Sequence, residues 1–225
     1  MASTEKDTDI KENIFQAAKC LFYEKGYKDT FFSDIANKLG ITKGLITYYF
    51  STKSNLANQI YTNFLKSNQN TLSLKTYVKF KDKYSYNPRI TTAVSNIATF
   101  NMYKDDENAQ RFVREFLNDN LQFSIENDDL SLWHIHRRAI DKERFSNLEY
   151  MKLISFSARG ATGVLQLAYF NGKLNITFDE FMDFYLRLKY QIENLPEEEI
   201  TRTLSIAKEI YSKLDVVFKP YFVIE

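Results

Sequence analysis

The sequence predicts an all-α fold, with an N-terminal three-helix domain followed by a larger helical domain. Apolar residues recur at intervals of three and four along most of the chain, and only 3 of its 225 residues are proline and 6 are glycine. Such spacing places apolar side chains on one face of a helix, and the scarcity of helix-breaking residues permits long helices. We expect residues 1–55 to form the first domain and residues 56–225 the second.

One long helix and two short ones are expected in the first domain. The long helix covers about residues 6–25, and Gly26 then permits the left-handed conformation that often ends a helix. A helix of about two turns follows over residues 33–39. Thr42 can cap the third helix, over residues 44–50, because its side-chain oxygen can accept an amide hydrogen bond.

Further helices would form the second domain. Asn87 and Pro88 mark a break, and Thr177 and Glu180 have the spacing of a capping box at a helix start. Over residues 67–87 the periodicity is weak and a short strand would suit the pattern equally; we expect a helix there. The other predicted helices cover about residues 53–66, 89–103, 107–123, 129–141, 148–170, 178–195 and 196–218.

Composition excludes several classes of protein. The chain is 44% hydrophobic with a net charge of +1, which is too apolar and too balanced for a disordered chain. Its single cysteine, Cys20, cannot form an internal disulfide, which fits a reducing compartment, and we expect a cytoplasmic protein. The start of the chain is polar and shows no signal peptide. The best candidate for a membrane span, residues 151–170, is interrupted by Lys152 and Arg159, so none is expected.

Residues 33–50 have the layout of a helix-turn-helix. In that motif two short helices cross at a small residue, here Ala36, and a glycine such as Gly40 turns the chain between them. Ile41 would fill the core, and Thr42 would cap a helix whose exposed N-terminus attracts phosphate. The sequence therefore predicts a protein that places the second of these helices in the major groove of DNA.

A longer ordered string surrounds this motif. It consists of Ala17, Ala18, Leu21, Phe22, Glu24, Lys25, Gly26, Tyr27, Thr30, Asp34, Ile35, Ala36, Leu39, Gly40, Ile41, Thr42, Lys43, Gly44, Tyr48, Tyr49, Phe50, Lys53 and Leu56. Over about residues 10–60 the chain thus resembles the tetracycline-repressor (TetR) family of transcriptional regulators. It departs from the usual pattern at Phe31, Thr47 and Ser54, where the family usually has a small hydroxyl residue, tyrosine and glutamate.

The resemblance implies a homodimer that binds a palindromic operator in double-stranded DNA and releases it when a small-molecule effector binds the second domain. Members of this family are most often repressors. An alternative with the same fold is a dimeric architectural or cell-division DNA-binding protein without an effector. The residues that the resemblance places at the DNA are Ser33, Thr42, Lys43, Gly44, Thr47, Tyr48, Tyr49 and Lys53.

The basic residues of the first domain add a constraint on the operator. All of them are lysines, since the first arginine of the chain is Arg89. Arginine or lysine bound to guanine is the commonest specific base contact, and Lys43 is the one obvious candidate for it. We therefore expect an operator rich in A·T pairs with few essential guanines.

Aromatic residues make up 16% of the chain, and many fall between Phe100 and Tyr169. Small-ligand sites are usually concave and lined by aromatic side chains with a few polar groups, although for each phenylalanine the plain core is the more frequent place. The candidates for an effector site are Phe100, Asn101, Tyr103, Phe116, Phe123, Trp133, His134, Arg137 and Tyr169.

We expect no metal, no cofactor and no catalytic residue. His134 and His136 lie two residues apart, so a helix would not bring them to one face. An enzyme is disfavoured because no nucleophile motif and no metal-ligand spacing is visible. Gly160 and Gly163 lie in an apolar run where small residues let two helices approach closely, either across a dimer interface or within one chain.

Overall fold

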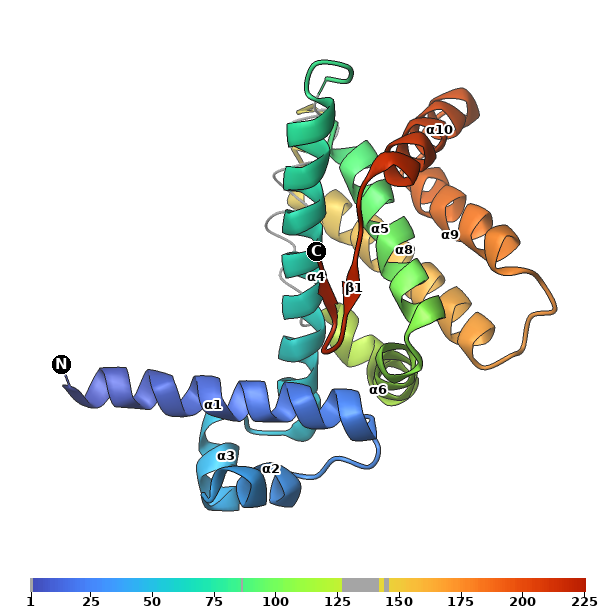
Figure 1. The fold of residues 1–225 in the computed structure, drawn as a ribbon. Coiled ribbons are helices and arrows are strands. Elements are labelled where there is room, and N and C mark those ends of the chain that lie inside the picture. Colours follow the sequence, from blue (N-terminus) through green and yellow to red (C-terminus); the bar gives the residue numbers. More distant parts are fainter. Residues whose placement is uncertain (1, 86, 127–141, 144–145) are drawn as a thin grey trace.

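The computed structural model describes residues 2–85, 87–126, 142–143 and 146–225, with residues 2–7 as backbone alone. In these residues the fold is helical apart from one short hairpin, which confirms the all-α prediction (Figure 1). The expected helix over residues 129–141 lies outside the described residues. The elements are α1 (Ala2–Lys25), α2 (Phe32–Leu39), α3 (Lys43–Tyr49), α4 (Lys53–Phe80), α5 (Pro88–Asp105), α6 (Glu107–Glu126), α8 (Leu148–Phe170), α9 (Phe178–Ile192), α10 (Glu197–Lys213), β1 (Phe218–Lys219) and β2 (Val223–Ile224).

Helices α2 and α3 lie beneath α1 at one end of the molecule (Figure 1). Gly40 has a φ of 66°, and in the turn that it makes the amide of Ile41 donates to the carbonyl of Ala36 at 3.1 Å. Thr42 caps α3, since its Oγ1 accepts from the amide of Leu45 at 3.4 Å. The turn and the cap predicted for this motif are therefore present.

Helix α4 connects this end to the rest of the molecule (Figure 1). It runs without interruption to Phe80, 14 residues beyond the predicted end at residue 66, and the expected domain boundary at residue 55 falls in its first turn. The apolar pattern weakens in the second half because polar residues occupy inward-facing positions. Asn68 is 3% exposed; its Nδ2 donates to the carbonyl of Phe222, and its Oδ1 accepts from the amide of Ile224.

The C-terminal segment differs from the prediction. Helix α10 ends at Lys213; of the residues expected to continue it, 214–217 lie in neither helix nor strand, and Phe218 begins the hairpin of β1 and β2. Phe222, in the turn of this hairpin, is 1% exposed. Its ring centroid lies 5.3, 4.9 and 5.1 Å from those of Tyr23, Phe64 and Phe112, which belong to α1, α4 and α6. The hairpin thus joins three helices around one buried ring.

Helices α5, α6, α8, α9 and α10 build the larger part of the molecule beside the upper portion of α4 (Figure 1). Helix α5 is central, because it packs against α4, α6, α9 and α10. A buried ion pair between Arg89 and Glu193, with Nε and Oε2 3.7 Å apart, ties the start of α5 to the end of α9. No described helix is both long and apolar enough to cross a membrane.

Candidate nucleic-acid interface and effector cavity

Helix α3 buries one face and exposes the other. Ile46 is fully buried and Phe50, just after the helix, is 1% exposed, so both anchor α3 on the core of the small domain. On the opposite face, Lys43 and Thr47 are exposed, and Tyr48 is exposed at 76%. Because residues four apart share a face of a helix, these side chains form one surface that points away from the protein.

Most of the residues predicted to contact DNA lie on this surface or beside it. Ser33, Thr42 and Gly44 are exposed, while Tyr49 is half-buried and packs edge-on against Tyr48 with ring centroids 5.0 Å apart. The hydroxyl of Thr47 donates to the carbonyl of Lys43 at 3.2 Å. The N-terminus of α3 is therefore presented together with polar side chains, as groove and phosphate contacts require.

Lys53 has a second role at the start of α4. Its Nζ donates to the carbonyls of Tyr27 and Lys28 at 3.0 and 3.4 Å and lies 4.4 Å from the ring centroid of Tyr27. Burial lowers the pKa of this lysine, opposed by the acidic residues around it. The ammonium group thus fastens α4 to the loop after α1 with two of its three N–H donors.

The exposed Phe31 occupies a position where the family usually has a hydroxyl residue, and it precedes α2. Its side chain is 58% exposed and cannot accept a capping hydrogen bond, whereas Asp34 Oδ2 accepts from its amide at 2.8 Å. Of the two hydrogen bonds of a capping box, the one from the Phe31 amide to the Asp34 carboxylate is therefore present. Lys53 also lies 5.2 Å from the Phe31 ring centroid, so this departure from the family pattern brings a ring beside the cation.

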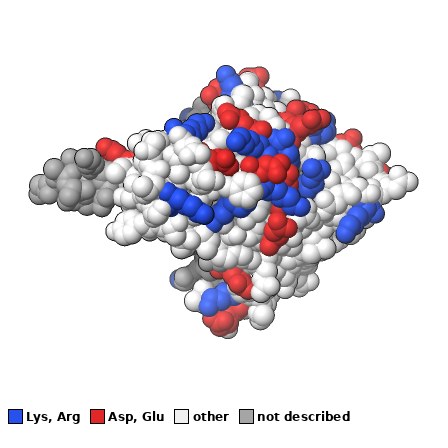
Figure 2. All heavy atoms as spheres, turned by 90° about the horizontal axis from the view of Figure 1, so that it is seen from below, with Lys and Arg blue, Asp and Glu red and all other residues white. Residues whose placement is uncertain are grey.

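Charge on this end of the molecule is mixed. In Figure 2, basic and acidic side chains lie next to one another, and uncharged residues cover much of the surface. Lys28, Lys38 and Lys43 are exposed in this part of the chain, as is Asp29. Binding to DNA would therefore depend on contacts around α3 and not on a broad basic surface.

Comparison with known proteins agrees with this geometry. The family model for bacterial regulatory proteins of the tetR family matches residues 14–60, which span the second half of α1, all of α2 and α3 and the first turns of α4. Residues 14–60 therefore carry the DNA-binding domain of the TetR family. The family is one of transcriptional regulators and not of enzymes, and α1–α3 with the start of α4 form its DNA-binding part.

Other comparisons are more distant. A solved structure of a gamma-butyrolactone receptor, an ArpA-like protein, is 17% identical over 93% of this chain and 100% of its own, with a TM-score of 0.42. A proposed TetR-family transcriptional regulator from Mesorhizobium loti MAFF303099 is 16% identical over 92% of this chain and 96% of its own, with a TM-score of 0.33. No curated protein matches the chain.

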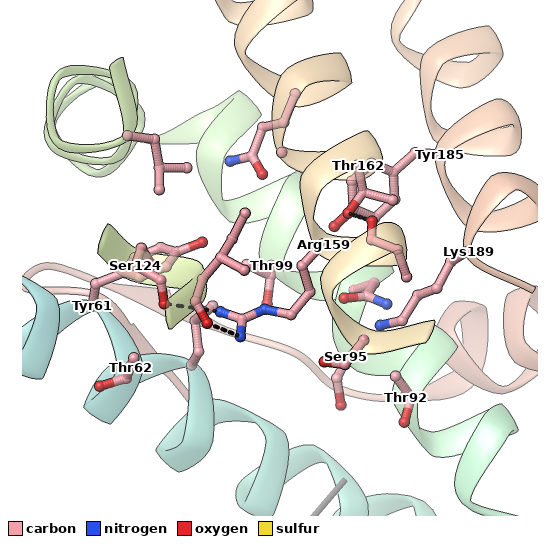
Figure 3. Close-up of a pocket in the computed structure, with 18 of the residues that line it drawn as sticks. Tyr61, Thr62, Thr92, Ser95, Thr99, Ser124, Arg159, Thr162, Tyr185 and Lys189 are labelled. Carbon is pink, nitrogen blue, oxygen red and sulfur yellow. Dashed lines mark hydrogen bonds between the residues drawn. The ribbon is translucent and has the colours of Figure 1, made fainter. Parts of the chain in front are cut away.

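The larger part of the molecule contains a cavity of about 260 Å³. Helices α4, α5, α6, α8 and α9 all contribute to its wall. Arg159 of α8 and Lys189 of α9 point into it, and Thr92 and Ser95 of α5 lie on the neighbouring wall (Figure 3). The described part of the chain therefore holds a partly open cavity, lined by polar and apolar side chains, of a size that suits a small organic molecule.

The guanidinium of Arg159 reaches across the cavity wall to the end of α6. Its NH1 and NH2 donate to the carbonyls of Ile125 and Ser124, each at 3.2 Å. These carbonyls belong to the last turn of α6, where the helix dipole is negative and a cation is stabilising. Because Arg159 belongs to α8, these hydrogen bonds connect α8 to the end of α6 at the cavity wall.

The aromatic residues selected from the sequence lie one layer behind this cavity. The ring of Phe100 is 4.6 Å from that of Tyr185, and the ring of Phe116 is 5.6 Å from that of Tyr61; both tyrosines belong to the wall. Tyr103 is 2% exposed, and burial, with the neighbouring Tyr61 and Tyr185, raises its pKa well above the usual value. These rings support the wall and do not face the cavity.

The other selected residues that the structure describes do not line the cavity either. Asn101 donates to the carbonyl of Ile97 at 2.8 Å, Phe123 is half-buried, and Tyr169 stacks on Phe181 with ring centroids 4.2 Å apart. Trp133, His134 and Arg137 lie outside the described residues, as does His136. On α5 the wall is formed by residues 92, 95, 96 and 99, a face rotated from that of Phe100 and Tyr103.

Sequence reasoning missed the residues that form the wall because most of them are polar and not aromatic. The signal that could have found them is a row of Thr, Ser and Asn at helical spacing inside an otherwise apolar helix. On α5 this row is Thr92, Ser95, Asn96 and Thr99, where a core helix would carry aliphatic side chains. Among the described residues, no group of His, Cys, Asp or Glu is arranged to hold a metal ion.

Two helices join the cavity to the DNA-binding part. Helix α4 lines the cavity with Tyr61 and Leu65 and begins beside α3. Helix α6 lines it with Leu117 and Leu121, while Glu115 Oε2 accepts from the amide of Lys28 at 2.9 Å. A change in the cavity wall can therefore reach the loop after α1 through either helix.

Proposed function

We propose that this chain is a cytoplasmic, effector-controlled transcriptional repressor that binds a palindromic operator as a homodimer. The observation that carries the proposal is the outward face of α3, on which Lys43, Thr47 and Tyr48 are all exposed while Ile46 is buried. A helix anchored on one face and exposed on the other at one end of the molecule suits insertion into a major groove. The proposed DNA contacts are Ser33, Thr42, Lys43, Gly44, Thr47, Tyr48, Tyr49 and Lys53.

Exposed apolar residues on α8 and α9 support a dimer through these helices. Leu153, Phe156 and Val164 lie on one face of α8 with exposures of 66%, 43% and 61%, and Phe184 of α9 is exposed at 57%. An added Cβ at Gly160, on the same face of α8, would meet nothing within 4 Å. An apolar strip of this kind on a helix is typical of an interface between protein chains.

Gly163, in contrast, serves an internal contact. A Cβ at this position would lie 2.5 Å from Leu121 Cδ1, so the glycine allows α6 to approach α8 closely. The sequence left open whether Gly160 and Gly163 pack across a dimer interface or within one chain. Gly163 packs within the chain, and we assign Gly160 to the dimer face.

Control by an effector would work as a shift between two arrangements. A ligand in the cavity contacts α4 and α6, and both helices also contact the DNA-binding part. If the ligand binds best when these helices are displaced, it favours a spacing of the two α3 helices that no longer fits adjacent major grooves. Unchanged operator affinity in the presence of a ligand bound in the cavity would reject this coupling.

A gel shift tests DNA recognition directly. An operator is first selected from a random pool of duplexes with wild-type protein, and then titrated with Lys43→Ala, Tyr48→Ala and the control Lys173→Ala, which changes an exposed residue between α8 and α9. We expect each α3 variant to bind roughly tenfold more weakly or worse, since a good base contact is worth about 1–3 kcal/mol, and the control to bind normally. Undiminished binding by both α3 variants would refute the site.

Genome-wide occupancy separates this function from the architectural alternative. A regulator with an effector occupies one or a few promoter sites, whereas an architectural protein occupies many dispersed sites. The cavity favours the first, because a purely architectural protein has no use for a polar cavity within its helical core.

A further inference from the structure

We propose that the C-terminal hairpin fixes the angle between the DNA-binding part and the larger part, and so determines which half-site spacing the dimer accepts. Asn68, Tyr221 and Phe222 are the positioning residues of this device. The inference rests on the proposed function, because it names what sets the operator spacing of the same pair of α3 helices. The contacts of the segment that follows α10 carry it.

Helix α4 by itself defines this angle poorly. It has 28 residues and is about 42 Å long, and helices of this length bend. A bend of about 5° displaces the far end of such a rod by about 4 Å, which is close to the rise of one base pair. Helix α6 gives α1 one further support, since Arg111 Nη2 donates to the carbonyl of Glu24 at 2.8 Å. The C-terminal segment gives it another.

The C-terminal segment is fastened to α4 at three points along the helix. Lys79 Nζ donates to the carbonyl of Lys213, and Lys75 Nζ donates to the carbonyl of Asp215 at 2.7 Å. Nearer the DNA-binding part, Asn68 holds the hairpin through both atoms of its amide, each in a hydrogen bond of 3.1 Å. Figure 1 shows this segment running along α4 from α10 towards α1. It therefore braces α4 against bending.

The turn of the hairpin meets the last turns of α1. The hydroxyl of Tyr221 donates to Glu24 Oε1 at 3.1 Å, and its ring centroid lies 4.8 Å from that of Tyr23. Phe222 packs edge-on against the same Tyr23 ring and stacks on Phe64 of α4. The segment thus connects α10 and α4 of the larger part to the helix that carries α2 and α3.

The backbone of this turn is strained, and its side chains account for the strain. Tyr221 and Phe222 have φ values of 63° and 65°, in the left-handed region that bulky residues rarely adopt. Glycine and asparagine are the usual residues at such positions of a hairpin turn. A strained conformation persists where the surrounding structure holds it. We therefore assign the two aromatic residues to the contact with α1 and not to formation of the turn.

A spacing series on the intact dimer tests this role. The operator selected with wild-type protein is compared with duplexes in which one base pair is inserted or removed at its centre. Such a change shifts the half-sites by about 3.4 Å and turns one against the other by about 35°. Asn68→Leu separates the hairpin from α4, and Tyr221→Ala, at a position 37% exposed, separates it from α1 without opening the core.

Two controls accompany these variants. Val217→Ala changes an exposed side chain of the same segment, and Leu204→Ala lowers stability at a buried position of α10 that is not part of these contacts. Sedimentation establishes whether each variant remains a dimer.

We expect wild type and both controls to bind the altered spacings roughly tenfold more weakly or worse, because a rigid pair loses base contacts in one half-site. The two hairpin variants should bind the selected operator about threefold more weakly or worse, since a mobile α3 must be ordered on binding. They should also distinguish the spacings by less than about threefold, because a mobile α3 can follow either one.

Loss of spacing discrimination in either hairpin variant, with both controls unchanged, supports the proposal. It is overturned if wild type does not distinguish the spacings, if both hairpin variants discriminate as wild type does, or if a control also loses discrimination. Hairpin variants that sediment as monomers would overturn it too, because the hairpin would then act on assembly and not on the angle.

The outcome is separable from that of the proposed function. If wild-type protein selects no operator with two half-sites, the proposed function fails. If it selects one and both hairpin variants keep its spacing discrimination, the regulatory function stands and only the role of the hairpin is lost.

Discussion

At the scale of single residues, Lys43 would limit the operator sequences that the proposed DNA-binding face can read. It is the one basic residue on the exposed face of α3, and no arginine lies in α1–α4. We predict that selection from a random pool yields an A·T-rich consensus in which few guanines are essential. The reason is that Thr47 and Tyr48 would contact thymine methyl groups and phosphates, not guanine. A strongly G·C-rich consensus would contradict this.

Glu209 gives a second residue-scale prediction, for stability against pH. Hydrogen bonds from Lys213, Lys83 and Tyr84 lower the pKa of this carboxyl to about 2 from 4.5. Its contribution to the free energy of unfolding is therefore fully present above about pH 4.5 and is lost as the pH falls towards 2. Glu209→Gln should lower Tm at neutral pH, with the difference from wild type shrinking through this window.

The control for this measurement is Asp82→Asn, which removes a nearby exposed carboxylate. Its difference from wild type should be small, since single exposed charges contribute little. A Glu209→Gln difference that stays constant from pH 7 to pH 2 would show that the three hydrogen bonds do not stabilise the ionised form.

At the scale of elements, the C-terminal hairpin acts as a joint between the two parts of the molecule. Phe222 contacts rings of α1, α4 and α6, and Asn68 holds the backbone of the hairpin. Phe222→Ala should reduce the free energy of unfolding in urea by about 3–5 kcal/mol, as for other large buried rings. Val217→Ala, at a position 49% exposed, is the control and should change it little. A loss below 1 kcal/mol for Phe222→Ala would exclude this role.

The elements also show what the sequence could and could not predict. The capping box at Thr177 and Glu180 and the turn at Gly40 were predicted because local chemistry alone determines them. The end of α10 was missed because the apolar spacing continues through Phe218, and only tertiary packing makes that segment a hairpin. The far half of α4 gave a weak pattern because Asn68 bonds to residues more than 150 positions away.

The candidate sites differ in the same way. The face proposed to bind DNA can be located from the sequence because one ordered string of residues within about 50 positions builds it. The residues selected for an effector site lie partly on helices that line the cavity, α5 and α6, but on α5 they occupy a different face, since the cavity wall is assembled from five helices far apart in sequence. Residues such as Arg159 and Lys189 have no local signature, and only the tertiary fold brings them together.

At the scale of the whole molecule, the proposed function requires two copies of α3 at a fixed distance. The exposed apolar strip on α8 provides a surface through which a symmetric pair could form. Phe156→Glu should therefore give a monomer in sedimentation, while Leu74→Glu, at an equally apolar exposed position on α4, should leave the dimer intact. The monomer should also lose operator affinity, because each half-site alone contributes only part of the binding energy.

Hydroxyl-radical footprinting of the selected operator tests the central claim most directly. With wild-type protein we predict two protected segments related by a two-fold axis, with centres separated by about one helical turn (10–10.5 base pairs) or a multiple of it. Both should disappear together in Lys43→Ala and in Phe156→Glu at concentrations that saturate wild type. A single protected segment, or a footprint that Lys43→Ala leaves unchanged, would contradict DNA recognition by a pair of α3 helices.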